Sequence, residues 1–248
     1  MTEFSYQLFS SRNWPLADTT RMIADLGYTQ AEGYGGLYAD LPALKAALDD
    51  AGLTMPSGHF ALDMVEDDPA RVIGICRTLG TSMVFVPFIG PDARPLDAAG
   101  WTTLGQRLEA AAGPLIEAGL LVGWHNHAFE YAPLPTGELP MDILLAAAPS
   151  LKVELDVAWV VRAGLDPVAQ IRKLGRRIVA VHLKDLAPEG EKTDEGGWAD
   201  FGTGTMGWDQ IIAAIRADTA ATVFVAEHDQ PSDHSRFAAR AIANARAF

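Results

Sequence analysis

The chain has 248 residues, 19 basic and 32 acidic side chains, and a formal net charge of −13. That length fits one large domain or two small ones. Hydrophobic residues make up 49% and charged residues 21%, the balance of a globular protein rather than a disordered one. The single cysteine, Cys76, excludes an internal disulfide framework and a zinc site built from several thiolates.

The acidic charge argues against nucleic acid as the main partner, because phosphate binding needs clustered Lys and Arg. No apolar run approaches the roughly 20 residues that span a bilayer. Residues 1–5 show neither the basic nor the apolar region of a secretory signal. We therefore expect neither a nucleic acid nor a membrane as partner, and a cytoplasmic location.

Eight short apolar runs predict β-strands. In chain order they are Phe4–Phe9, Gln30–Glu32, Leu53–His59, Met83–Pro87, Leu120–His125, Leu151–Asp156, Ile178–Lys184 and Val223–Glu227. The amphipathic stretches between and after them predict helices: Ala17–Leu26, Leu41–Ala51, Pro69–Leu79, Gly100–Ala118, Met141–Ala148, Pro167–Leu174, Trp208–Ala217 and Asp233–Ala247. Strands that alternate with helices imply parallel strands joined by right-handed crossovers.

Eight strand–helix repeats in about 250 residues predict an α/β protein with a single (β/α)8 TIM barrel as one domain over residues 1–248. Asp68-Pro69 and Asp166-Pro167 support two helix starts, since each places a capping acid before a proline. An open doubly wound sheet is the alternative, but the Gly-x-Gly-x-x-Gly motif after the first strand is absent. The stretch 187–207 is predicted to be an irregular loop.

The histidines cluster by predicted position. Five of the six lie at or just past the C-terminal end of a predicted strand: His59, His125, His127, His182 and His228. In a parallel barrel these ends lie on one face and converge on the axis. A shared polar site is therefore expected, although any one of these histidines taken alone is as well explained as a hydrogen-bonded core residue.

Strand alternation places charged side chains at the same end of the barrel. The inward set is Lys152, Glu154 and Asp156, then His182 and Lys184, then Glu227 and Asp229. Crowded carboxylates are costly unless a cation compensates them. Oxygen-rich ligation with one imidazole suits Mn²⁺, Mg²⁺ or Co²⁺. Ion pairs with Lys152, Lys184 and Arg162 are the alternative, but the acids are too many for these cations alone.

Four segments resemble the xylose-isomerase-like TIM barrels, which include sugar isomerases, epimerases, inosose dehydratases and type IV apurinic endonucleases. They are Trp124–Glu130, Leu155–Trp159, Val181–Asp185 and Ala226–Asp229. The resemblance extends over nearly the whole chain and implies one divalent ion, with Mn²⁺ preferred. Its implied ligands are Asp156, His182, Glu227 and a fourth side chain near the fifth strand, for which we predict Glu130, with His125 as the alternative.

Trp159 departs from the family pattern. Members often carry a His at this position, which the endonuclease branch uses to hold an additional zinc. Together with the acidic charge, Trp159 argues against a multi-zinc nuclease and for a single-metal enzyme acting on a carbohydrate. The ion would polarise the carbonyl of a keto-sugar, so that proton abstraction leaves a metal-bound enediolate.

The predicted function is therefore a metal-dependent sugar isomerase or epimerase. A metal-dependent dehydratase (lyase) of a keto-cyclitol or 3-keto sugar is the alternative, and a non-catalytic sugar-binding barrel is a third. The resemblance implies acid–base roles for Glu130 and Glu227. His127, with an ordinary pKa near 6.5, and Lys184 are further candidates.

Substrate contacts are predicted for Glu32, His59, His125 and Trp159. The glycine-rich segment 201–207 is at most a weak signal for phosphate, because no Lys or Arg adjoins it. An unphosphorylated sugar or cyclitol is therefore favoured. Tryptophans near predicted loops leave room for the interface of a homo-oligomer.

Overall fold

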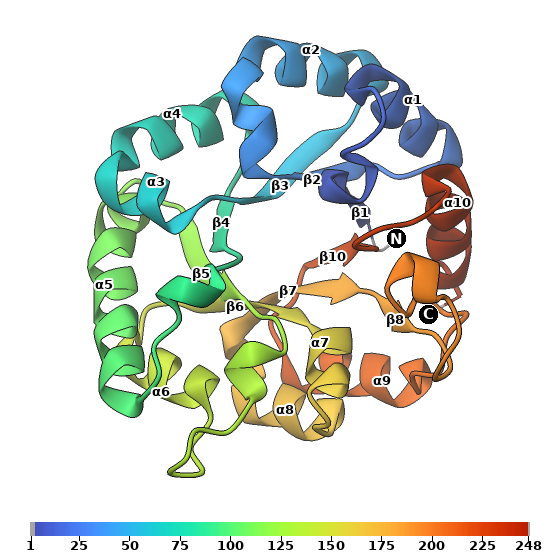
Figure 1. The fold of residues 1–248 in the computed structure, drawn as a ribbon. Helices are drawn as coiled ribbons and strands as arrows, with labels where there is room; N and C mark the ends of the chain where they lie inside the picture. Colours follow the sequence, from blue (N-terminus) through green and yellow to red (C-terminus); the bar gives the residue numbers. More distant parts are fainter. Residues whose placement is uncertain (1–2, 248) are drawn as a thin grey trace.

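The computed structural model describes residues 3–247, in which eight parallel strands close a barrel ringed by helices (Figure 1). The barrel strands are β1 (Phe4–Gln7), β2 (Gln30–Gly33), β3 (Thr54–His59), β4 (Met83–Val86), β5 (Leu121–His125), β6 (Lys152–Asp156), β7 (Ile178–Leu183) and β10 (Val223–Ala226). Neighbours in the chain are neighbours in the barrel, and β10 closes it against β1. This arrangement confirms the predicted (β/α)8 barrel.

The eight predicted helices are all present, with ends that shift by at most a few residues. They are α1 (Leu16–Leu26), α2 (Leu41–Ala51), α4 (Pro69–Leu79), α5 (Ala98–Glu117), α6 (Pro140–Ala147), α8 (Pro167–Leu174), α9 (Trp208–Asp218) and α10 (His234–Ala245). The two predicted caps form: the Asp68 carboxylate accepts from the Arg71 amide, and Asp166 accepts from the Val168 amide.

Three short elements lack a counterpart in the prediction. They are the helices α3 (Leu62–Asp67) and α7 (Val157–Arg162) and a two-stranded ribbon of β8 (Asp185–Leu186) and β9 (Trp198–Ala199). The expectation of a wholly irregular 187–207 is therefore wrong at β9. Segments of two to six residues are too short to show a hydrophobic period, so tertiary contacts decide their conformation.

The barrel interior is filled below the polar end. A small apolar cluster of buried strand residues comprises Met83, Phe85, Val179, Ala180, Val223 and Val225. His182 lies two residues after Ala180 on its strand, and Glu227 lies two residues after Val225. Because side chains alternate along a strand, each of these polar residues shares the face of the apolar residue before it. The apolar plug thus closes the barrel beneath the polar side chains, as layered side chains do in barrels of this kind.

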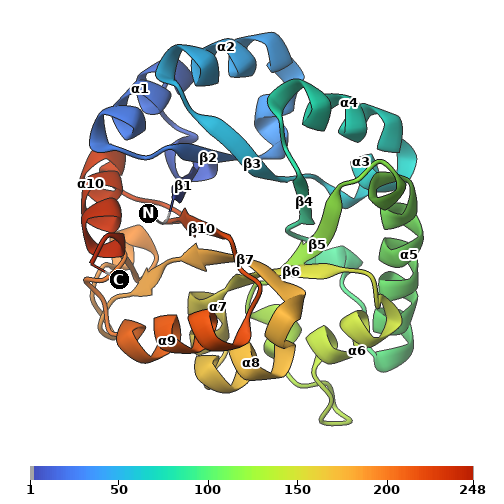
Figure 2. The same ribbon diagram turned by 180° about the vertical axis from the view of Figure 1, so that it is seen from behind.

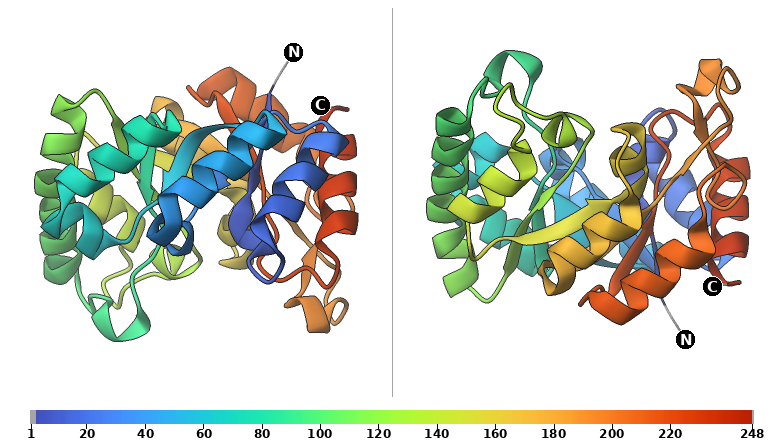
Figure 3. Two further views of the ribbon diagram at one scale, coloured as in Figure 1. Left: turned by 90° about the horizontal axis from the view of Figure 1, so that it is seen from above. Right: turned by 90° about the horizontal axis from the view of Figure 1, so that it is seen from below.

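The loops that follow the strands gather at one end of the barrel. In both side views of Figure 3, the segment after β4 and the segment after β7 project from the same end. Figure 2 shows the other end, where the chain enters the strands. Within residues 3–247, no helix combines the length and apolar character needed to cross a bilayer.

Candidate functional site

A cavity of about 480 Å³ opens at the C-terminal end of the barrel strands. Its lining has two kinds of wall. One is largely aromatic and apolar, with Phe9, Tyr34, Ala61, Pro87 and Phe88. The other is ionisable, with His59, His125, His127, Glu227 and Asp229.

Four buried side chains meet at the foot of this cavity. His125, Asp156, His182 and Glu227 each offer one ligand atom, and these atoms lie within 4.8 Å of one another. They come from the ends of β5, β6, β7 and β10, which are consecutive in the barrel. We call them the outer quartet. The structure therefore brings together the three strand-end residues Asp156, His182 and Glu227.

Glu130 does not join the outer quartet. It is fully buried in the 3-10 turn η4 (Phe129–Tyr131), five residues beyond the end of β5. Both of its oxygens are engaged locally: the Trp124 indole donates to Oε1 at 2.8 Å, and the His127 amide donates to Oε2 at 2.9 Å. Burial raises the pKa of Glu130 to about 8. Of the two candidates near the fifth strand, the structure places His125 beside Asp156.

A second layer of buried ionisable side chains lies deeper in the barrel than the outer quartet. Glu154 precedes Asp156 by two residues on β6 and is fully buried. One of its oxygens, Oε2, lies 2.6 Å from His59 Nε2, 3.0 Å from His125 Nδ1 and 3.3 Å from His182 Nε2. Burial opposes ionisation of Glu154, but the charges of His182 and His59 outweigh it and hold its pKa well below the usual range.

Glu32 belongs to this second layer. It is fully buried, and its Oε1 lies 2.8 Å from His182 Nε2 and accepts from the Gln7 amide at 2.7 Å. The Ser57 hydroxyl donates to its other oxygen. Burial, assisted by the charge of Glu154, raises the pKa of Glu32 to about 7. With no exposed surface and both oxygens engaged, Glu32 faces protein groups rather than the cavity.

Lys184 is buried among carboxylates. Its ammonium nitrogen lies 2.7 Å from Asp229 Oδ1, 3.2 Å from Glu227 Oε2 and 3.3 Å from Asp156 Oδ2. It also lies 4.4 Å from the ring centre of Trp198, a cation–π contact. Burial disfavours the charged amine, but the three carboxylates outweigh it and raise the pKa of Lys184. The side chain therefore stays cationic.

His127 occupies an apolar part of the cavity wall. Its ring centre lies 5.2 Å from the Trp159 ring and 5.4 Å from the Phe88 ring, and its Nδ1 has no hydrogen-bond partner among the described residues. Burial, followed by the neighbouring His125, lowers the pKa of His127 to about 2. The pKa of His127 therefore lies below the ordinary value expected from the sequence, because burial and His125 outweigh the opposing charge of Glu227.

Asp185 organises the loop above Lys184, a role that the strand pattern did not reveal. Its carboxylate accepts from the amides of Leu186, Gly202, Gly204 and Met206 and from the Trp208 indole. Such a convergence of donors cannot be seen from spacing, because the four amides come from both sides of a loop. The loop is thereby held over the end of β7.

The donor set of the outer quartet fits a divalent ion. It supplies two carboxylates and two imidazoles, which suit ions such as Mn²⁺. Asp156 Oδ1 accepts from the Trp159 amide, whereas Oδ2 accepts no hydrogen bond from any described residue. A second group of buried ligand atoms, from His59, His125, Glu154 and His182, shares two histidines with the quartet. This part of the protein could hold a metal ion.

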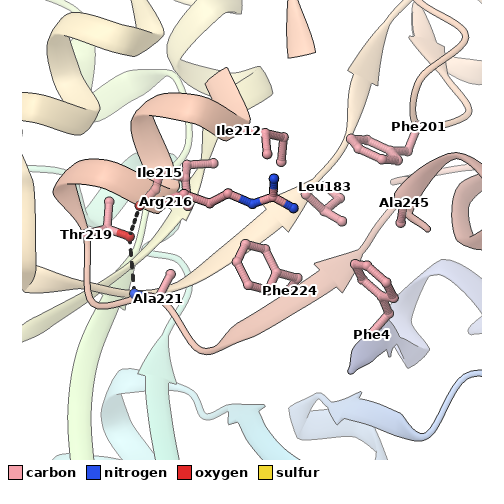
Figure 4. Close-up of a pocket in the computed structure, with 10 residues that line it drawn as sticks. All are labelled: Phe4, Leu183, Phe201, Ile212, Ile215, Arg216, Thr219, Ala221, Phe224 and Ala245. Atoms are coloured by element: carbon pink, nitrogen blue, oxygen red, sulfur yellow. Dashed lines mark hydrogen bonds between the residues drawn. The ribbon is translucent and has the colours of Figure 1, made fainter. Parts of the chain in front are cut away.

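Another cavity, of about 250 Å³, lies away from these residues, beside the starts of β1 and β10 and the helices α9 and α10 (Figure 4). Its walls are mostly apolar. Thr219 Oγ1 donates to the Ile215 carbonyl and accepts from the Ala221 amide at its edge. It contains no member of the outer quartet, so the chemistry of the molecule is concentrated at the other end of the barrel.

Comparison with known proteins agrees with the barrel fold. The family model described as xylose isomerase-like TIM barrel matches residues 21–246. The inosose dehydratase of Geobacillus kaustophilus is 26% identical over 188 residues, which are 66% of this chain and 60% of that enzyme. The aligned part thus spans about three fifths of that relative.

Two solved structures share the fold. A sugar phosphate isomerase/epimerase from Parabacteroides distasonis superposes with a TM-score of 0.82 at 19% identity, covering 99% of this chain and 94% of that one. A probable 3-DHS dehydratase involved in petrobactin synthesis from Bacillus anthracis gives 0.78 at 16% identity, covering 99% of both chains. With the family match over most of its length, the chain belongs to the xylose isomerase-like TIM barrels.

Proposed function

We propose that the protein is a divalent-metal-dependent isomerase or epimerase of a keto-sugar. The observation that carries the proposal is the outer quartet, because side chains from four consecutive strands converge at the foot of a cavity large enough for a monosaccharide. His125, Asp156, His182 and Glu227 would hold the ion, with Mn²⁺ the preferred candidate. When bound, such an ion supplies Lewis acidity that makes a C–H beside a carbonyl more acidic.

The surrounding side chains have distinct tasks in this proposal. Glu227 lines the cavity and is placed to accept a proton from a bound sugar. The Lys184 ammonium is buried 3.2 Å from Glu227, outside the cavity lining, and its positive charge would stabilise the negative charge that develops as the proton leaves. His127 lines the cavity with the Trp159 ring 5.2 Å behind it, and the two rings would lie against the bound sugar.

The cavity favours an unphosphorylated substrate. No Lys or Arg appears among its described lining residues, whereas Glu227 and Asp229 do. Nearby arginines are engaged elsewhere: Arg12 lies over Phe9 and donates to backbone carbonyls, and Arg94 lies over Phe129 and donates to the Ile89 carbonyl. Carboxylates would repel a phosphate, while the aromatic wall can cover the apolar face of a neutral sugar.

A dehydratase of a keto-cyclitol or 3-keto sugar is the second candidate. A β-elimination begins with the same proton abstraction but also needs a proton donor for the departing hydroxyl. Lys184 is a buried cation 3.2 Å from Glu227, and its charge would stabilise negative charge on the departing oxygen. The inosose dehydratase and the 3-DHS dehydratase among the similar proteins also favour this alternative.

The test is to incubate the Mn²⁺-loaded protein in D₂O with unphosphorylated keto-sugars and keto-cyclitols and to analyse the products by mass spectrometry. An epimerase or isomerase incorporates solvent deuterium without losing water, whereas a dehydratase product is lighter by one water. Chelator-treated protein and phosphorylated versions of the same sugars are the controls. Sugar binding without deuterium exchange or product in every case would instead identify a binding protein.

The choice between His125 and Glu130 is tested by metal affinity. We expect His125→Ala to weaken Mn²⁺ binding by about 100-fold or more, exceeding the roughly 10–100-fold typical of losing an outer-shell partner. Glu130→Gln should leave the affinity nearly unchanged, because that carboxylate accepts from the Trp124 indole and the His127 amide and lies outside the outer quartet. Isothermal titration calorimetry measures both, and the reverse pattern would assign the ligand to Glu130.

A further inference from the structure

Glu154 is the point at which imidazoles from three strands converge. His59 from β3, His125 from β5 and His182 from β7 all direct a ring nitrogen at its Oε2, at 2.6, 3.0 and 3.3 Å. No Lys or Arg is among the described partners of Glu154, and its Oε1 accepts no hydrogen bond from them. A buried carboxylate kept without an ammonium or guanidinium partner is costly for stability, so a functional reason is indicated.

The contacts of Glu154 determine which ring nitrogens remain for the outer quartet. His182 directs Nε2 at Glu154 and Glu32, and its Nδ1 lies 2.9 Å from Glu227 Oε2. His125 directs Nδ1 at Glu154, which leaves its Nε2. A histidine that gives one nitrogen to a metal carries its proton on the other, and an acceptor for that proton fixes both tautomer and ring orientation.

We propose that Glu154 is a positioning residue that orients both histidines of the outer quartet for metal binding, with Glu32 as a second acceptor for His182. The inference rests on the proposed function, because it presumes that the quartet holds the ion. It also explains why β6 carries two acids two residues apart: Asp156 faces the ion, and Glu154 faces the rings that bind it.

The test uses Glu154→Gln and the Co²⁺-loaded protein. The variant keeps the size of the side chain but removes the charge that accepts from the imidazoles. We expect the Kd for Co²⁺ to rise by roughly 10–100-fold and the visible absorption bands of bound Co²⁺ to change, because the ligand rings are no longer held in one orientation. Glu154→Asp, which keeps the charge on a shorter side chain, should give an intermediate Kd.

Glu195→Gln is the matched control. Glu195 is equally buried and pairs with Arg236 at 2.7 Å, in the loop after β7 and outside both groups of ligand atoms. The control should lose thermal stability yet keep the parental Kd and Co²⁺ spectrum. Should Glu154→Gln fail to fold, the Kd and Co²⁺ spectrum of Glu154→Asp are compared with those of the parental protein instead.

Two results would overturn the inference. One is a parental Kd and spectrum in a folded Glu154 variant. The other is a second equivalent of Co²⁺ in the parental protein that Glu154→Gln loses while keeping the first, which would make Glu154 the ligand of a separate ion. A parental protein that binds no divalent ion at all is a different failure, because it removes the proposed function itself.

Discussion

Asp156→Asn is expected to weaken metal binding and activity together while leaving the fold intact. Asp156 supplies one of the two carboxylates of the outer quartet, and the nearest cation to its Oδ2 is the Lys184 ammonium at 3.3 Å. Its Oδ1 also caps α7 by accepting from the Trp159 amide at 3.0 Å. Asparagine caps helices about as well as aspartate, so the substitution removes the charge at the site but keeps the cap.

Calorimetric titration with Mn²⁺ and thermal unfolding separate the two effects. We expect the Kd to rise by about 100-fold or more, above the range for outer-shell changes, with little change in the melting temperature of the metal-free protein. Asp166→Ala is the control, since Asp166 caps α8 at the surface. It should cost about 1 kcal/mol of stability without affecting Mn²⁺. Parental affinity in Asp156→Asn would show that the quartet is not the metal site.

Lys184→Met is expected to move activity and metal affinity in opposite directions. The ammonium lies 3.3 Å from Asp156 and 3.2 Å from Glu227, so it repels a cation held by these carboxylates. Its loss should tighten Mn²⁺ binding. Turnover should fall by about 100- to 1,000-fold, the usual effect of removing one group that stabilises developing negative charge. Methionine retains an apolar side chain of similar length against Trp198.

The same substitution leaves three carboxylates without their shared cation in the metal-free protein. Breaking a buried ion pair in this way costs about 3–5 kcal/mol, and Lys184 is fully buried. Saturating Mn²⁺ should therefore raise the melting temperature more in the variant than in the parental protein. Lys173→Met, which removes an exposed lysine paired with Asp142 at 2.6 Å, should change none of these quantities. Weaker Mn²⁺ binding in Lys184→Met would contradict the proposed charge balance.

The alternation of strands and helices was predictable from the sequence because the hydrophobic period of a strand and that of a helix both show within a short stretch of chain. A strand that alternates apolar and charged residues, such as Leu151–Asp156, and an amphipathic helix, such as Leu41–Ala51, each show their structure within one window of the chain. Once eight repeats are recognised, barrel closure follows, and with it the convergence of strand ends. The alternation within β6 likewise predicted that Glu154 and Asp156 face inward, and both are buried.

The tertiary structure decided how these side chains pair, because the pairing depends on register between strands that are distant in the chain. The β5–β6 register sets His125 level with Glu154, and the β6–β7 register, after a shift at Val153 and Glu154, sets Asp156 level with His182. Spacing along one strand contains no information about such offsets. The sequence by itself thus determined which end of the barrel carries the polar side chains, whereas the register between strands determined which of them pair.

Only the folded barrel separated the residues that face the cavity from those that support them. The sequence led us to expect a substrate contact for Glu32 and an acid–base role for His127. The structure buries Glu32 beside His182 and places His127 among aromatic rings, where burial lowers its pKa. Burial and charge act through space on groups from several strands, so a residue's protonation and its partners are properties of the closed barrel rather than of any single segment.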